Sequence, residues 1–168
     1  MKKIVAVILI FFLSGCERAS AITTEEKVMI KGLSGYVIGL AWDEICNGTN
    51  PQSRYEDFTK KENVNLIGNR QLFGARLGGV LHVRHPKKSA DEILLILNNM
   101  EKSIDQKARQ KLKGEGCGGE TAKAASKTYL LFSSTHPAVI NKFMDKSIVD
   151  AGGTVTSSDE IESTGVKP

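Results

Sequence analysis

The chain has 168 residues, enough for one domain of ordinary size whose core is stable without a metal ion, and too few for a second catalytic domain. Hydrophobic residues make up 40% and charged residues 25%, which excludes a disordered, collagen-like or multispan membrane protein. The formal net charge of +4 is too small for a nucleic-acid-binding protein without a concentrated basic face.

The N-terminus carries a targeting segment. Two lysines follow Met1, and residues 4–13 are apolar without a charge. A basic start before a short apolar run is typical of a secretory signal peptide, because the run is too short to span about 30 Å of hydrocarbon. We predict that residues 1–15 are removed and that residues 16–22 form a tether.

The apolar run ends in residues 13–16 (LSGC), which resemble the bacterial lipobox. The resemblance implies that Cys16 is acylated and becomes the mature N-terminus, and two or three acyl chains would anchor the protein almost permanently. Glu17 stands where aspartate retains lipoproteins at the inner membrane, which implies the periplasmic side of the outer membrane of a Gram-negative bacterium. Cleavage after residues 19–21 (ASA) is the alternative and would release a soluble periplasmic protein.

The other two cysteines, Cys46 and Cys117, remain as an even pair once Cys16 is assigned to lipid. In an oxidising compartment such a pair is expected to form a disulfide. The bond would close a loop of about 70 residues and contribute about 4 kcal/mol in the chain-entropy model. The alternative is a catalytic thiol or a metal ligand. The sequence does not favour it, because there is no CxxC motif and no histidine lies within ten residues of either cysteine.

The first predicted helix of the mature chain begins after Thr23, because residues 23–26 have the spacing of a capping box, and ends near Asn47. Six residues at alternating steps of four and three share one of its faces: Val28, Gly32, Gly35, Gly39, Trp42 and Cys46. Glycine costs about 1 kcal/mol in a helix interior, so three on one face predict a close neighbouring helix.

The next two segments are less regular. Residues 49–62 are polar and mixed, which predicts a loop with at most two helical turns around Tyr55 and Phe58. Residues 64–85 fit helical spacing, but Gly78 and Gly79 would also allow a hairpin between two short strands. We favour the helix and leave the hairpin open.

A further helix is predicted to start at Ser89 and to stop at Gly114. Its apolar stripe consists of Ile93, Leu97, Met100, Ile104, Ala108 and Leu112. The lysines and arginine near its C-terminal end complement the helix dipole, with a binding patch for acidic lipid or protein as the minority interpretation. The glycine-rich residues 114–119 predict a flexible link, because no Lys-Ser/Thr ending follows to make a phosphate loop.

The last two predicted helices span about residues 120–132 and from His136 to before Gly152. The first of them places small residues on one side, including Ala124 and Thr128. A disulfide between the two cysteines would set it antiparallel to the first helix, with Gly32, Gly35 and Gly39 forming a helix-packing seam against Ala124 and Thr128. The predicted fold is all-α, a small bundle of about four to five helices over residues 23–150 stapled by one disulfide, with residues 151–168 as a disordered C-terminal tail.

The sequence predicts neither catalytic residues nor a cofactor. His82 and His85 have a spacing that two metal ligands on one helix face would use, but no third ligand is evident, so we predict no metal site. The sequence contains no GxSxG and no HExxH motif. We therefore expect a binding protein and not an enzyme.

Two stretches resemble one family. Residues 35–39 (GYVIG) followed by Asp43, together with the segment from Cys117 to Pro137, are similar to small periplasmic immunity proteins of the resistance-associated family, which neutralise peptidoglycan-cleaving type VI secretion effectors. The resemblance covers about 55 residues and implies a disulfide-bonded helical domain whose surface blocks a cell-wall amidase. The segment between Gly48 and Gly116 is longer than in that family.

We therefore expect a lipid-anchored protein that binds a protein partner and no nucleic acid. Its partner-facing residues should be exposed aromatic and basic side chains in residues 49–62 or 64–85, since loops and insertions carry specificity on a rigid scaffold. The alternatives are a secretion or conjugation accessory lipoprotein, of the pilotin or entry-exclusion type, and a periplasmic chaperone of the acid-stress type.

Overall fold

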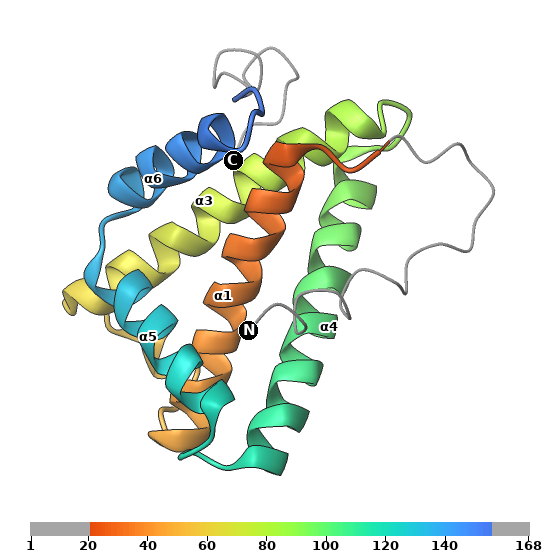
Figure 1. The fold of residues 1–168 in the computed structure, drawn as a ribbon. Coiled ribbons are helices and arrows are strands. Elements are labelled where there is room, and N and C mark those ends of the chain that lie inside the picture. Colours follow the sequence, from red (N-terminus) through yellow and green to blue (C-terminus); the bar gives the residue numbers. More distant parts are fainter. Residues whose placement is uncertain (1–20, 156–168) are drawn as a thin grey trace.

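A computed structural model describes residues 21–155, which fold into a bundle of helices around one central helix (Figure 1). The helices are α1 (Thr24–Cys46), α2 (Ser53–Glu56), α3 (Lys61–Arg84), α4 (Ala90–Glu115), α5 (Glu120–Ser134) and α6 (Pro137–Asp150). The prediction of an all-α bundle closed by one disulfide is confirmed, with five long helices and the single turn α2. The predicted signal peptide, Cys16 and the tether up to residue 20 lie outside the described residues.

The central helix is α1, which packs against α3, α4, α5 and α6. Its middle is apolar or small on every side, with Met29, Leu33 and Ala41 fully or almost fully buried. A helix that is apolar all round must be surrounded by others, because no face of it is suited to water. The buried carboxylates of α1 lie in its first and last turns. Each of these two ends forms a polar cluster with other helices.

Helix starts follow the capping residues in the sequence. Thr23 caps α1 by accepting a hydrogen bond from Glu26 N at 3.1 Å, and Ser89 caps α4 with the reciprocal contact from Glu92. The capping box at the start of α1 is only half formed, because the Glu26 carboxylate pairs with Arg84 and not with the backbone of Thr23. His136 caps α6, with Pro137 at the first helical position.

Residues 61–84 form one helix and not a hairpin. The buried side chains Phe73, Leu77, Val80 and Leu81 keep helical spacing through the two glycines. Each of the two glycines lowers the stability of the helix by about 1 kcal/mol. The burial of this apolar face contributes more than the glycines cost. The four-residue α2 agrees with the loop predicted for residues 49–62.

The disulfide joins Cys46, at the end of α1, to Cys117, just before α5, with 5.6 Å between the two Cα atoms. The two helices therefore run antiparallel, with α5 beside α1 in Figure 1. Gly35 lies opposite Thr128, and Gly39 lies against the backbone of Tyr129.

Two residues of the predicted seam lie elsewhere. Ala124 is exposed, and the neighbouring Ala122 and Ala125 are buried instead, so the predicted small face of α5 was wrong by one position. An alanine-rich helix has a weak apolar signature, because each alanine adds little apolar area. Gly32 does not face α5 either; it makes room for the Phe73 ring of α3.

The fold continues beyond the predicted start of the tail at residue 151. Gly153 N donates to Ile148 O at 2.9 Å, Gly153 packs against Thr24, and Val155 packs on the core. The remainder of the predicted tail, residues 156–168, lies outside the described residues. Among residues 21–155 no helix is both long and apolar enough to cross a bilayer.

The seam gives a testable prediction for Gly39. A Cβ at this position would lie 3.0 Å from Tyr129 N and 3.1 Å from Tyr129 Cα, backbone atoms that have little freedom to move. Gly39→Val should therefore lower the free energy of unfolding by about 2–3 kcal/mol in urea titrations. Gly74→Ala is the matched control: nothing lies within 4 Å of its Cβ, so helix propensity should raise stability by about 1 kcal/mol. A Gly39→Val protein as stable as the wild type would refute the close approach of α1 and α5.

Candidate functional site

A cleft of about 290 Å³ opens between α1, α3 and α4, with α2 at its rim. Tyr36 and Leu40 of α1 line its interior, and Tyr55 of α2 and Arg70 of α3 stand on its edge. Tyr55 is 42% exposed, and the side chain of Arg70 is 45% exposed. The edge of the cleft therefore offers one aromatic and one guanidinium group to solvent.

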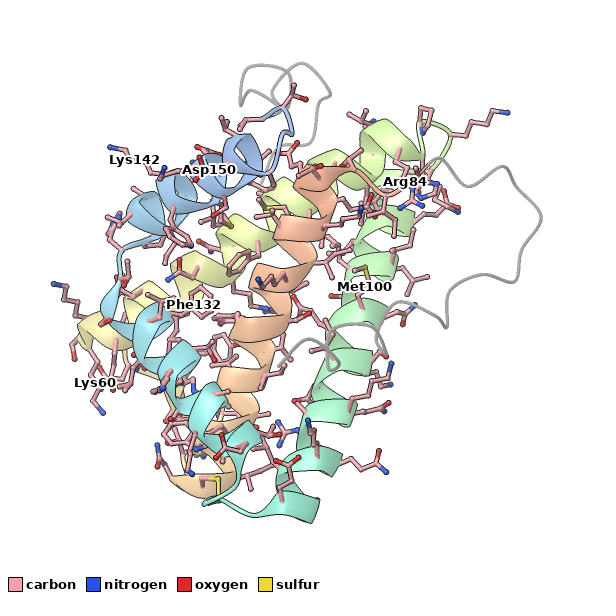
Figure 2. The ribbon with its side chains drawn as sticks, in the orientation of Figure 1. Lys60, Arg84, Met100, Phe132, Lys142 and Asp150 are labelled. Atoms are coloured by element: carbon pink, nitrogen blue, oxygen red, sulfur yellow. A yellow bond between two sulfur atoms is a disulfide. The ribbon has the colours of Figure 1, made fainter. Side chains whose placement is uncertain are left out.

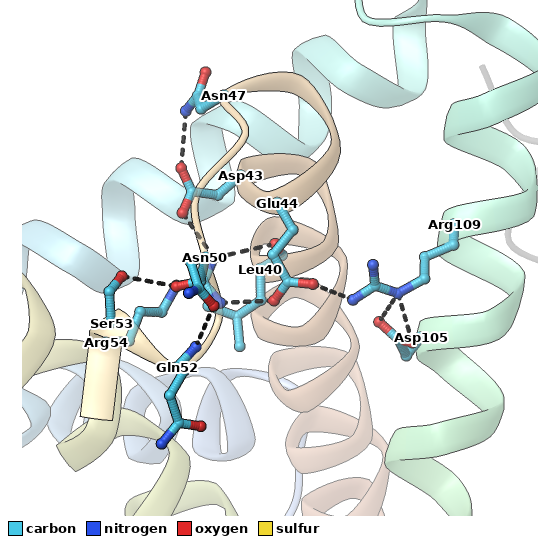
Figure 3. A network of polar contacts seen from close by, with 10 residues as sticks. All are labelled: Leu40, Asp43, Glu44, Asn47, Asn50, Gln52, Ser53, Arg54, Asp105 and Arg109. Atoms are coloured by element: carbon cyan, nitrogen blue, oxygen red, sulfur yellow. Dashed lines mark hydrogen bonds and ion pairs between the residues drawn. The ribbon is translucent and has the colours of Figure 1, made fainter. Parts of the chain in front are cut away.

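A buried ion-pair network fixes α2 beside the cleft (Figure 3). Arg54 Nη2 donates to Asp43 Oδ2, and Arg54 Nη1 donates to Glu44 Oε1, both at 2.7 Å. The side chains of Arg54 and Asp43 are only 5% and 3% exposed. Asn47 Nδ2 donates to the other Asp43 oxygen at 2.8 Å, so both carboxylate oxygens of Asp43 have a partner.

The same network continues across the cleft to α4. Arg109 Nη2 donates to Glu44 Oε2, and Arg109 Nε donates to both oxygens of Asp105 at 2.7 and 2.8 Å. Glu44 thus lies between Arg54 of α2 and Arg109 of α4 (Figure 3). The Glu44 carboxylate, at the end of α1, therefore links α1 to both α2 and α4.

Proton affinities around the cleft follow from burial and charge. Burial lowers the pKa of Arg54, but hydrogen bonds to Asp43 and Glu44 outweigh it, so the pKa is raised and the side chain stays charged. Burial raises the pKa of Tyr36 above its ordinary value. Burial, and then the negative charge of Asp43, raise the pKa of Tyr129 to about 12. At neutral pH the Arg54 guanidinium therefore stays charged and the Tyr36 and Tyr129 hydroxyls stay protonated, which is consistent with structural roles.

A second polar cluster ties the other end of α1 to α3 and α6. Arg76 donates to Glu25 at 2.8 Å, to Asn141 at 2.8 Å and to Asp145 at 2.5 Å. Arg84 donates to the buried Glu26 at 2.5 Å. Each end of α1 therefore carries two carboxylates that are neutralised by arginines from other helices.

Two buried asparagines of α3 complete the polar interior. Asn65 donates to Ser133 O at 2.9 Å, and Asn69 donates to Phe132 O and Thr135 O at 2.9 and 3.1 Å. These contacts satisfy carbonyls at the C-terminal end of α5 that have no partner within their own helix. They fix the start of α6 relative to α3.

The structure brings together the two segments in which partner-facing residues were predicted. Tyr55 comes from residues 49–62 and Arg70 from residues 64–85, and both line the same cleft. Phe58, 61% exposed, lies on the loop between α2 and α3. Sequence reasoning missed the buried arginines Arg54 and Arg76. The available signal was a helix with an apolar middle and acids in its first and last turns, because such buried acids need cationic partners from elsewhere in the fold.

The resemblance motif has a structural role in this chain. Gly35 and Gly39 admit α5, Tyr36 packs between Phe73 and Phe132, and Asp43 binds Arg54. The histidines predicted not to form a metal site, His82 and His85, lie near the C-terminal end of α3. Within residues 21–155 no three His, Cys, Asp or Glu side chains are grouped to hold a metal ion.

These features define a disulfide-closed helical bundle with a charged cleft rimmed by tyrosine and arginine. Comparisons with known protein families, with curated proteins and with solved structures found no match.

Proposed function

We propose that this chain is a lipid-anchored protein on the periplasmic side of the outer membrane that binds another protein at the Tyr55–Arg70 cleft. The observation that supports binding is the meeting of Tyr55 and Arg70 on one edge of the cleft. Tyrosine and arginine are enriched among the residues that dominate binding energy at protein interfaces. The ion pairs of Arg54 hold α2 in place before a partner arrives, which reduces the entropy lost on binding.

The partner class that we propose is a secreted effector that cleaves peptidoglycan, which this chain would neutralise without catalysing a reaction. This proposal is supported by the resemblance of residues 35–43 and 117–137 to the immunity family. A preformed surface favours tight binding of such a partner, and residues 24–150 are held by a disulfide and by buried ion pairs.

The binding proposal is tested by a pull-down from membrane extracts with the acylated chain as bait. Replacing Tyr55 or Arg70 by alanine should weaken capture of the partner about 30-fold, the effect of losing about 2 kcal/mol at an interface hot spot. Leu130→Ala on α5 is the control, because Leu130 is also exposed but does not line the cleft. Denaturant titrations should show that all three variants remain folded.

The identity of the captured protein decides the partner class. A cell-wall amidase would support the immunity function, whereas a secretion-channel subunit would support the accessory alternative. Undiminished capture by the Tyr55 and Arg70 variants would refute the cleft as the binding site. Mass spectrometry of the bait tests the anchor: acylated Cys16 is expected, and an unacylated chain beginning at Ile22 would contradict it.

A further inference from the structure

The outward surface of α6 is amphipathic although the helix already buries a different face. Ile140, Met144 and Ile148 pack into the core. On the opposite side, Val139 and Phe143 are 57% and 66% exposed. Two lysines alternate with these apolar residues, and Figure 2 shows Lys142 pointing away from the bundle. The four residues Val139, Lys142, Phe143 and Lys146 have the i, i+3, i+4, i+7 spacing of one helix stripe, which we call the α6 stripe.

The charge of the α6 stripe is positive and open to solvent. Lys142 has no acidic partner among its contacts within residues 21–155, and Lys146 lies 3.2 Å from Asp150. Both members of that pair are largely exposed, so water screens it and the lysine remains able to interact elsewhere. Lysines beside exposed Phe and Val side chains are the pattern of helices that lie at the surface of anionic membranes.

The α6 helix also lies at the end of the molecule where the chain leaves toward Cys16. Its C-terminal turn packs there, because Gly153 lies against Thr24. Arg76 joins Glu25 of α1 to Asp145 of α6, so the two helices move as one body. Cys16 and Thr24 are eight residue steps apart in the sequence, a length of chain that can reach at most about 28 Å. An acylated Cys16 therefore keeps α6 close to the bilayer.

We propose that the α6 stripe lies on the headgroup layer of an anionic bilayer and thereby orients the anchored domain. This inference rests on the proposed lipid anchor, which brings the membrane within reach. The opposite end of α1 is about 35 Å away along the helix axis. The Arg54 network and Tyr55 are at that end, so the orientation directs this edge of the cleft away from the bilayer and toward a partner.

Helix α5 provides a matched control stripe. Lys123, Lys127 and Leu130 are exposed at the same kind of spacing, with two lysines and one large apolar residue. This helix starts beside the disulfide, at the end of the bundle opposite to Thr24. The α5 stripe carries the same number of lysines as the α6 stripe, so its variants measure how much of the vesicle binding comes from basic charge alone.

The experiment is co-sedimentation of the mature chain carrying Cys16→Ser with vesicles that contain phosphatidylglycerol, or phosphatidylcholine alone. We expect binding only to the anionic vesicles, lost at high salt. Lys142→Gln with Lys146→Gln should weaken it about 25-fold, at about fivefold for each lysine, and Phe143→Ser should weaken it about tenfold. Lys123→Gln with Lys127→Gln, and Leu130→Ser, should leave it unchanged.

Three outcomes would overturn the proposal. Equal losses in the α5 variants would show that general basic charge binds the vesicles. Retained binding in the Phe143→Ser and Lys142→Gln/Lys146→Gln proteins would place the contact elsewhere. A Phe143-dependent dimer without vesicle binding would assign the stripe to a second copy of the chain. The Cys16→Ser variant carries no lipid. Its vesicle binding therefore tests the α6 stripe whether or not an acylated Cys16 is found on the natural chain.

Discussion

Replacing Arg54 by methionine should lower the free energy of unfolding by about 3–5 kcal/mol. The expected loss is large because Arg54 pairs with both Asp43 and Glu44, and Asp43, only 3% exposed, would lose its cationic partner inside the protein. Methionine matches the length of the arginine stem, so the lost packing is small and the measured effect reports the charge. Urea titration followed by helical circular dichroism measures the change.

Two comparisons isolate the ion pair. Combining Arg54→Met with Asp43→Asn should recover part of the lost stability, because the uncompensated buried charge disappears. Arg70→Met is the surface control: its pair with Glu101 at 3.1 Å is exposed and should contribute no more than about 1 kcal/mol. If Arg54→Met lowers the free energy of unfolding by less than Arg70→Met does, the structural role of the buried network is contradicted.

Removing the disulfide, by Cys46→Ser with Cys117→Ser, should lower the free energy of unfolding by about 4 kcal/mol. The bond spans a sequence separation of 71 residues, so its loss releases a long loop in the unfolded chain. It also joins the end of α1 to the start of α5, where Ala41, Ala108, Leu112 and Ala122 form a small separate core cluster. We therefore expect hydrogen exchange to accelerate first in the N-terminal turns of α5.

A reducing agent provides the matched test. It should destabilise the wild-type protein by the same amount and leave the double serine variant unchanged. Unaltered stability of the wild-type protein under reducing conditions, with the bond shown to be open, would contradict the account of this linkage. The test is made in chains carrying Cys16→Ser, so that no third thiol exchanges with the pair.

Much of the architecture could be predicted from the sequence because local signals and tertiary structure agree. Thr23, Ser89 and His136 precede helices that they cap, and the even cysteine pair determines that α1 and α5 are antiparallel. The choice between helix and hairpin for residues 64–85 needed tertiary information, since two adjacent glycines suit either structure. Burial of Phe73 and Leu77 against the core decides it.

The site could be predicted only in part, for a different physical reason. Sequence reasoning placed partner-facing residues in the segments that supply Tyr55 and Arg70, but not their meeting at one cleft. The partners of the α1 carboxylates come from other helices, and an arginine's place in the sequence does not tell which acid it binds. Arg54 binds acids 10 and 11 residues away, whereas Arg76 binds one 69 residues away.

The proposed role of the cleft is tested most directly by site-specific photo-crosslinking in the living cell. A photoreactive amino acid at position 55 should give one discrete adduct with a single partner protein, while the same group at position 130 on α5 should give none. Both positions are exposed, so accessibility alone predicts equal labelling. A discrete adduct at position 55 alone supports partner binding at the cleft; absence of any adduct there, or the same adducts from both positions, would contradict it.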